Sequence, residues 1–199
     1  MLHRSSLLKM ALVAGVVSFA LMAGAFAQDA TYVGNGQCKI CHNKKEEGEA
    51  WNKWKAEAHS KAFALLSSDE AKAVGTAKGL AKPPAESPEC LKCHVAGYDV
   101  ATGKAPEKIQ PADGVQCETC HGPASAHTAE SKKFKSGVKT AKPAEKIVRA
   151  NADTCKKCHN EESPTWKADR YTLADGTKAG FDYEQAWKKI DHSNPLKKK

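Results

Sequence analysis

Every cysteine in the chain belongs to one repeated motif, which constrains the fold more than any other feature of the sequence. In each of its four copies two residues separate a pair of cysteines, and a histidine directly follows the second cysteine. The four CxxCH motifs comprise Cys38, Cys41 and His42; Cys90, Cys93 and His94; Cys117, Cys120 and His121; and Cys155, Cys158 and His159. A disulfide framework gives no reason for the histidine. Structural zinc sites would use the cysteines in paired motifs, but they also leave the adjacent histidine unexplained.

The spacing of the motif suits covalent attachment of haem. Two thiols three positions apart lie on one face of a helical turn, where each can add to a vinyl group of the same porphyrin and form a thioether. The next residue, a histidine, then lies beneath the iron and serves as its proximal ligand. The sequence therefore predicts four covalently attached c-type haems, with the eight cysteines as attachment sites and the four motif histidines as iron ligands.

The first 27 residues are typical of a cleaved export signal. Arg4 and Lys9 precede an apolar stretch, and Ala25-Phe26-Ala27 forms an A-x-A cleavage site before Gln28. The apolar stretch falls short of the roughly 20 residues that a membrane-spanning helix prefers. We therefore predict a signal peptide over residues 1–27 and one tetrahaem domain over residues 28–199, exported to the periplasm or beyond the cell, with no transmembrane segment after cleavage.

Large apolar side chains are scarce in the predicted mature chain. Leu, Ile, Val and Phe account for 20 of the 172 residues from Gln28 onward, about 12%, whereas a charged chain below roughly 20% is usually disordered. Four haems, each a large, flat and apolar body, would supply the interior that these side chains cannot fill. The chain without haem is therefore expected to be largely unfolded.

The basic composition does not predict nucleic-acid binding once the cofactors are counted. Two of the 31 Lys and Arg residues lie in the signal and all 23 acidic residues lie after it, so the mature chain carries a net charge of +6. Eight haem propionates and four ferric irons bring this to about +2. We therefore expect redox proteins rather than nucleic acids as partners, with a lysine run such as residues 132–133 or 197–199 as solvated surface or as a docking patch for an acidic partner.

The pattern of residues predicts a mainly α fold, in which short helices and long loops wrap around four c-type haems with little or no sheet. Trp51, Trp54, Ala58 and Ala62 recur at helical spacing, whereas no alternation of Val and Ile marks a strand. The predicted helices cover residues 44–66, 124–135, 144–159 and 182–192, and the predicted loops cover residues 75–88 and 97–114. Unequal intervals between the motifs give no sign of a repeat or of a second domain.

The remaining histidines of the mature chain limit the second axial ligands. His59, His127 and His192 lie outside the motifs, and all three Met residues lie in the signal, so methionine is not available as a sixth ligand. Three histidines complete three of four irons and leave one open. His127 follows His121 by six residues and would have to pass around the porphyrin edge to bind the same iron, which favours a different haem for it.

Several stretches resemble the tetrahaem cytochrome c-554 family of ammonia oxidisers. They are residues 51–66 (WNKWKAEAHSKAFALL), 93–98 (CHVAGY) and above all 114–123 (GVQCETCHGP), followed by His127, and the resemblance continues through residues 163–166 to His192. It implies a mostly helical protein with haems in closely stacked and near-perpendicular pairs, three of them with two His ligands and one five-coordinate.

The resemblance also implies a ligand for each haem. His127 would serve the first haem, His59 the third and His192 the fourth. The second haem, held by His94, would stay open.

The expected function is electron transfer between periplasmic redox proteins rather than catalysis. Four haems in one small domain lie close enough to pass electrons to one another. The sequence near His94 shows no recognisable set of acid and base residues for catalysis. In the ammonia oxidisers the family's partner is hydroxylamine oxidoreductase. The alternatives are a reductase for nitric oxide, nitrite or hydroxylamine at the open haem, and a subunit of an extracellular cytochrome filament, which full His ligation would favour and the count of three disfavours.

Four haems are expected to remain on the chain after acid–acetone extraction, because thioether bonds survive a treatment that removes non-covalent haem. Intact-mass spectrometry should give the mass of residues 28–199 plus four haem increments. Replacing Cys155 and Cys158 by Ala should remove one increment. Fewer than four increments on the unaltered chain would contradict the prediction.

Overall fold

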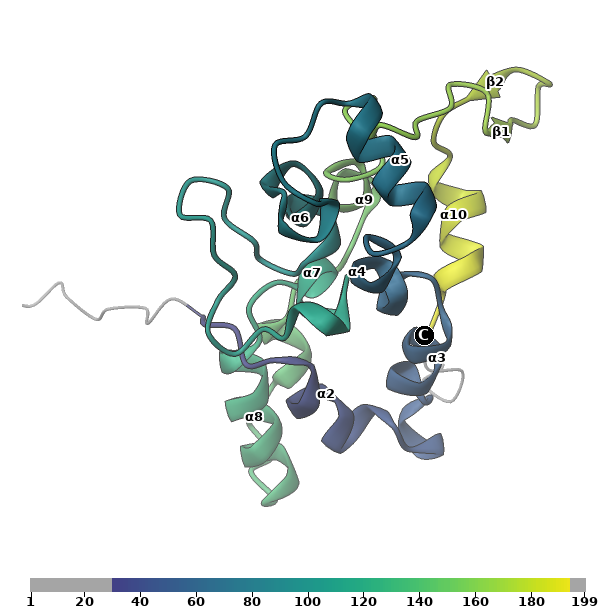
Figure 1. Ribbon diagram of the computed structural model, residues 1–199. Helices are drawn as coiled ribbons and strands as arrows, with labels where there is room; N and C mark the ends of the chain where they lie inside the picture. The colour runs from purple at the N-terminus through teal and green to yellow at the C-terminus, as the bar shows by residue number, and fades with distance from the viewer. Residues whose placement is uncertain (1–29, 194–199) are drawn as a thin grey trace, which may run out of the picture.

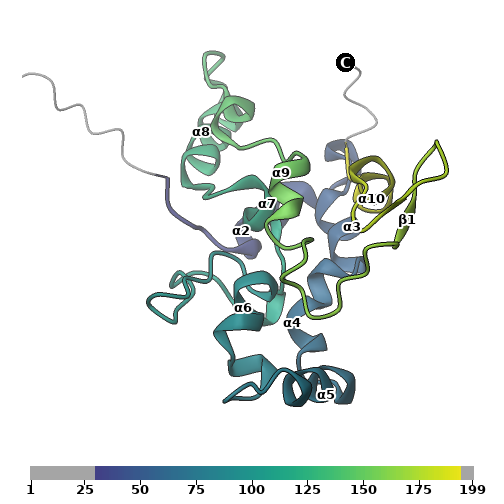
Figure 2. The same ribbon diagram turned by 90° about the horizontal axis from the view of Figure 1, so that it is seen from above.

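Short helices joined by long connections make up the computed structural model, which describes residues 30–193 (Figures 1 and 2). The two views show helices that run in different directions around the middle of the molecule rather than in parallel layers. The mainly α class expected from the sequence is confirmed. The predicted export signal, residues 1–27, lies outside the described residues. Between residues 30 and 193 no helix has the length and apolar character needed to cross a membrane.

The helices are short and the sheet is minimal. The α-helices are α2 (Asn35–His42), α3 (Ala50–Ala56), α4 (Ala62–Leu65), α5 (Asp69–Ala77), α6 (Pro88–His94), α7 (Cys117–His121), α8 (Ser125–Lys135), α9 (Ala152–Lys156) and α10 (Tyr183–Ile190). The 3-10 turns are η1 (Lys45–Glu47), η2 (His59–Lys61), η3 (Pro84–Glu86), η4 (Pro111–Asp113) and η5 (Pro143–Lys146). Strands β1 (Tyr171–Thr172) and β2 (Lys178–Ala179) form an antiparallel pair with Tyr171 opposite Ala179.

Each CxxCH motif adopts a helical turn, as its spacing predicted. Helices α2 and α6 end at the motif histidines His42 and His94, and α7 consists of the third motif alone. In the fourth motif α9 ends early, but the amides of Cys158 and His159 both donate to the carbonyl of Cys155, at 3.1 and 3.0 Å, and so continue the turn. The two cysteines of each motif therefore lie on one side of their turn, which thioether formation requires.

Polar side chains determine where three helices begin. Ser68 and Asp182 accept a backbone amide from the first turn of α5 and α10, at 3.1 and 2.8 Å. Asn151 and Thr154 form a reciprocal capping box at the start of α9. These contacts satisfy amides that have no partner inside the helix. The capping box thus fixes the start of the helix that leads into the fourth motif.

The helix expected over residues 44–66 is broken in the structure. It divides into η1, α3, η2 and α4, because Glu49 has a positive φ of 55° and Glu57 is extended with ψ 168°. The hydroxyl of Ser60 donates to the carbonyls of Lys55 and Glu57, both at 2.9 Å, and so stabilises the second break. These bonds compete with a continuous helix, and they turn the chain immediately before His59.

The other predicted segments agree with the structure to different degrees. Helices α8 and α10 confirm the helices expected over residues 124–135 and 182–192. The helix expected over residues 144–159 is wrong in its first part, where η5 gives way to extended backbone before α9. The segment 97–114 is a loop except for η4 and one isolated bridge between Asp99 and Lys104. The loop expected over residues 75–88 is wrong at its start, where α5 continues to Ala77, and it contains η3.

The apolar core is small and lies beside the second motif. Leu66, Leu91, Val95, Ala96 and Ile109 form its buried part. Partly buried side chains that pack against it are Tyr32, Phe63, Ala85, Cys90, Tyr98 and Ala105. Trp54 is buried elsewhere, and several large apolar side chains are exposed: Ile40, Leu65, Val100, Phe134, Val138 and Val148. The protein atoms alone thus provide a core for only one of the four motifs, in agreement with the shortage of large apolar residues.

Gly114 lets two distant segments approach closely. It has φ 64° and ψ −136°, and a Cβ at this position would lie 2.7 Å from the carbonyl oxygen of His59. The next residue, Val115, donates its amide to that carbonyl at 3.0 Å and accepts the indole N–H of Trp54 at 2.8 Å. The segment before the third motif therefore clamps the turn that carries His59.

Replacing Gly114 by Ala is expected to destabilise the haem-loaded protein because the added methyl group meets the His59 carbonyl. Overpacking of this kind costs about 1–3 kcal/mol, beyond the cost of a positive φ. Gly79→Ala is the control, since Gly79 also has a positive φ, 65°, but a Cβ there meets no atom within 4 Å. Thermal unfolding followed by circular dichroism should give a lower midpoint for Gly114→Ala than for Gly79→Ala, and equal midpoints would contradict the clamp.

Candidate functional site

Six of the seven described histidines face one another in three pairs. The ring centres of His42 and His127 are 6.2 Å apart, and the rings are nearly parallel, with 18° between their planes. His59 and His159 are 6.1 Å apart at 72°, and His121 and His192 are 6.0 Å apart at 75°. Two imidazoles that bind one metal ion at about 2.0–2.1 Å each have ring centres roughly 6 Å apart. Each pair is therefore spaced to hold one iron between its rings.

Hydrogen bonds to backbone carbonyls orient several of these rings. The Nδ1 atoms of His121, His127 and His192 each lie 2.9 Å from a carbonyl oxygen, that of Val148, Pro143 and Ile190 respectively. The Nδ1 atom of His94 lies 2.6 Å from the carbonyl of Ala62. A carbonyl only accepts, so Nδ1 carries the proton and Nε2 keeps its lone pair. This arrangement is the usual support for a metal-ligating histidine.

Burial keeps three of the rings in the neutral form that binds metal. The pKa of His59 is lowered by burial and further by the neighbouring His159. Burial is also the main cause that lowers the pKa of His121 and of His159. A neutral imidazole offers a lone pair without first losing a proton. Ligation of an iron by these rings would therefore not require the loss of a proton.

The pairing differs in part from the one implied by the family resemblance. His127 lies opposite His42 of the first motif, in agreement with the resemblance. His59 lies opposite His159 of the fourth motif rather than opposite the third, and His192 lies opposite His121 of the third motif rather than opposite the fourth. The ring contacts of His59 and His192 are therefore exchanged relative to that assignment, and the ligation itself stays a prediction. The Gly114 clamp holds the turn that carries His59, and the carbonyl of Ile190 at the end of α10 orients His192.

His94 is the motif histidine that stands apart from this pattern. Within residues 30–193 no imidazole stacks against its ring, and its fixed contact is the Ala62 carbonyl behind it. An apolar cavity of about 220 Å³ lies next to the second motif. It is lined by Phe63, Ala85, Leu91, Val95, Tyr98, Gly103, Ala105 and Pro111. Among the described residues, His94 is therefore the motif histidine that faces no second imidazole.

The eight cysteines are free and partly buried, and they bring the motifs together in a definite order. The thiols of Cys38 and Cys117 interact across the first and third motifs, which lowers the pKa of Cys38 and raises that of Cys117. The thiols of Cys93 and Cys158 interact in the same way across the second and fourth motifs, which lowers the pKa of Cys93 to about 7.

The third and fourth motifs also adjoin one another. The charge of Cys155 contributes to the rise of the Cys120 pKa to about 11, after the larger effect of burial. A salt bridge of 2.7 Å between Lys92 and Glu162 reinforces the contact of the second and fourth motifs. The order of contacts is therefore first, third, fourth, second, which differs from the order along the chain.

Buried polar atoms around the third motif lack partners in the protein. They include both side-chain atoms of the Gln116 amide and the Oγ1 of Thr119, and the indole N–H of Trp51 is a further case. A buried polar atom lowers the stability of the folded protein unless another group forms a hydrogen bond with it. Their place beside motif cysteines fits a cofactor that carries its own polar groups. The described residues hold no cluster of three or more His, Cys, Asp or Glu side chains arranged around a bare metal ion.

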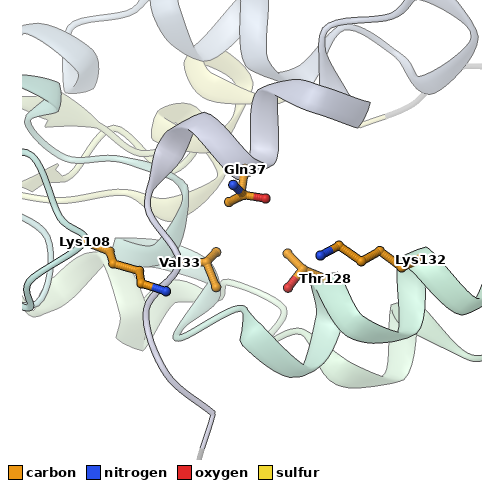
Figure 3. A pocket seen from close by; sticks show the side chains of 5 residues that line it. All are labelled: Val33, Gln37, Lys108, Thr128 and Lys132. Atoms are coloured by element: carbon orange, nitrogen blue, oxygen red, sulfur yellow. The ribbon is translucent and has the colours of Figure 1, made fainter.

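A cavity of about 350 Å³ separates the first motif from α8 (Figure 3). Gln37, next to Cys38, and Thr128, next to His127, line it from the two sides. Figure 3 shows the amino groups of Lys108 and Lys132 at opposite ends of this space. Two ammonium groups in such a position suit carboxylates on a ligand held between α2 and α8.

Glu118 is a buried residue that sequence reasoning missed. It lies between the two cysteines of the third motif and is 1% exposed. Its carboxylate accepts backbone N–H groups from Val33, Gly34 and Ala124. An acidic residue inside the motif was the one available signal, but only the folded chain brings the three donors to it.

The sequence matches the family model described as cytochrome c554 and c-prime over residues 37–122, which contain the first three motifs. Cytochrome c-554 of Nitrosomonas europaea is 32% identical over 145 residues, which are 67% of this chain and 60% of that protein. The chain thus spans less than two thirds of this curated relative. The solved structure of reduced cytochrome c554 from the same organism has 27% sequence identity and a TM-score of 0.46, with 81% of this chain and 78% of that chain covered.

Replacing His59, His127 or His192 by Ala is expected to convert one low-spin haem to high-spin, because each change removes one of two axial nitrogens. The near-parallel rings of His42 and His127 predict a rhombic low-spin signal. The crossed rings of the other two pairs predict signals with a large maximum g value, since crossing brings the iron dπ orbitals close in energy. Low-temperature electron paramagnetic resonance of the oxidised protein measures both properties.

Phe181 provides the control for the exchanged pairing. Its ring stacks on that of His159 at 5.5 Å. Phe181→Leu should therefore perturb the signal that His59→Ala abolishes and leave unchanged the signal that His192→Ala abolishes. The opposite result would restore the pairing implied by the resemblance.

Proposed function

The chain belongs to the cytochrome c-554 family, and from this premise we propose that it is a tetrahaem c-type cytochrome that carries electrons between redox proteins in the periplasm. The eight motif cysteines would attach the four haems. The proximal ligands would be His42, His94, His121 and His159, and the distal ligands His127, His192 and His59 for the first, third and fourth haem.

The observation that carries the proposal is the set of three facing imidazole pairs at 6.0–6.2 Å. In each pair one ring comes from a motif and the other from a distant part of the sequence. The carbonyl bonds at Nδ1 leave Nε2 as the binding atom in at least one ring of two of these pairs. Four attachment motifs and three pairs together support four haems, of which one has a single protein ligand.

Haem held in this way supplies one-electron chemistry through the ferric and ferrous states of its iron. The chain's own residues keep the redox sites close and rigid. Electrostatic interactions between motif cysteines link the first motif to the third, the third to the fourth and the fourth to the second. Fixed imidazoles keep their orientation when the charge between them changes. Close spacing and unchanged ligation are the properties that a carrier needs.

The predicted export signal supports a periplasmic location. It would deliver the chain to the compartment in which covalent haem attachment and exchange with other exported redox proteins take place. The domain over residues 28–199 would then act as a single unit, because the imidazole pairs link its first motif to α8, its third motif to the segment after α10, and its fourth motif to η2.

A second candidate function is reduction of a small molecule such as nitric oxide, nitrite or hydroxylamine at the second motif. It is favoured by one observation, that no described imidazole stacks opposite His94. His94 is held from behind by the Ala62 carbonyl, so its iron would have one face without a histidine. The carrier function remains the main proposal because three of the four sites are closed by ligand pairs.

Carbon monoxide is expected to bind one iron in four in the fully reduced protein, since three irons would have both axial positions occupied by histidine. Reductive titration should consume four electrons per chain. In stopped-flow mixing, an oxidised c-type cytochrome should then reoxidise the protein much faster than nitric oxide or hydroxylamine does.

The distal histidines provide the control for this experiment. His127→Ala should raise the carbon monoxide stoichiometry from one to two, because it opens the first haem. Sustained turnover of nitric oxide or hydroxylamine without a redox partner, at a rate above that of electron transfer to the cytochrome, would favour the enzyme instead.

A further inference from the structure

Glu118 holds a carboxylate in the interior at the point where three segments meet. Its Oε1 accepts the amides of Val33 at 3.0 Å and Ala124 at 2.9 Å, and its Oε2 accepts the amide of Gly34 at 2.8 Å. The residue is 1% exposed. At Gly34, where φ is 80°, a Cβ would collide with the carbonyl of Lys108, so the chain approaches the carboxylate through a position that only glycine suits.

The contacts of this side chain select the ionised carboxylate. All three partners are N–H groups, which only donate. A proton on either oxygen would face a donor and would remove one of the acceptor sites. Hydrogen bonds from several amides stabilise the charged form of a carboxylate. The interior therefore contains one negative charge beside Cys117 and Cys120.

Glu118 touches the segments that carry the ligands of two different irons. Val33 and Gly34 lead directly into α2, which ends at His42, and Ala124 leads into α8, which contains His127. Glu118 itself belongs to α7, which ends at His121. A contact of 3.1 Å from Cys117 Sγ to Asn35 Oδ1 joins the same segments. The carboxylate thus lies where the first and third motifs adjoin.

We propose that Glu118 lowers the reduction potentials of the first and third haems by holding a buried negative charge where their attachment motifs adjoin. The inference rests on the proposed tetrahaem function. Reduction transfers one electron from the donor to ferric iron, breaks no bond, and lowers the positive charge of the iron site by one. A nearby anion therefore favours the ferric state. Water screens an exposed carboxylate far more strongly than this buried one.

Glu118→Gln tests the charge because glutamine keeps the shape of the side chain and removes its charge. At a fixed potential the ratio of ferrous to ferric iron at the first and third haems should rise about tenfold, which for one electron corresponds to about 59 mV. Potentiometric titration followed by electron paramagnetic resonance measures each haem separately. The signals lost in His127→Ala and His192→Ala identify the first and third haems.

Two variants control for other effects. Glu89→Gln makes the same charge change next to Cys90, but Glu89 is exposed, and it should leave all four potentials unchanged. Glu118→Asp keeps the charge on a side chain one methylene shorter. At a fixed potential, the ferrous to ferric ratios of its first and third haems should therefore stay within a factor of about three of those in the unaltered protein.

The outcomes separate this inference from the proposed function. Intact mass first establishes whether four haems are attached; fewer would contradict the tetrahaem function and not the role of Glu118. Unchanged potentials in Glu118→Gln, or equal shifts in Glu118→Gln and Glu118→Asp, would overturn the charge effect. If the glutamine variant loses haem, the aspartate variant decides between the two explanations. Unchanged potentials of the first and third haems support the charge effect. A tenfold change in their ferrous to ferric ratio shows that the position of the side chain, and not its charge, sets these potentials.

Discussion

The facing of imidazole rings from distant segments is the contact on which the rest of the structure depends. Each ring pair joins a motif to a segment far away in the sequence, and an iron between the rings would make that contact a pair of coordinate bonds. Large apolar side chains are few from Gln28 onward, and among the described residues their main buried cluster lies beside the second motif while several others are exposed. In the proposed haem-loaded protein, ligation rather than side-chain packing would therefore provide most of the long-range order.

Backbone carbonyls make these pairs specific. They accept Nδ1 protons at His94, His121, His127 and His192, and none of them belongs to a regular sheet. Ala62 begins α4, Pro143 begins η5, Ile190 ends α10 and Val148 lies in an irregular segment. The ends of short helices and the loops thus supply the acceptors that orient these rings. Backbone groups also fix the segment directly before the third motif. There Val115 donates its amide to the carbonyl of His59 and accepts the indole N–H of Trp54.

The carboxylate of Glu118 connects positioning to redox behaviour. One side chain collects amides from the approach to α2 and from the entry to α8, and so places two ligand-bearing helices against the third motif. Because this side chain is a buried anion, the group that holds the motifs together would also favour the ferric state of the nearby irons. Structure and reduction potential are thus adjusted by the same group.

The amino-acid sequence by itself determined the features that are local. Two cysteines and a histidine within five residues define a helical turn with the sulfurs on one side, and α8 and α10 followed from periodicity and capping residues. The count of three further histidines predicted that one motif would lack a partner, and in the structure His94 is that motif histidine. Four covalent haems and their ligands remain predictions that the chemistry of these residues supports.

Only the tertiary structure decided which distant residues meet. The exchanged partners of His59 and His192, the breaks after Gly48 and at Glu57, and the amides around Glu118 all depend on segments that are far apart in the sequence. Local periodicity predicts which residues share a face of one helix. It cannot predict these contacts, because the course of the whole chain decides which distant segments lie next to a ring or a carboxylate. That path is set by the loops, which pair rings across the molecule and bring the motifs together in an order that the sequence does not follow.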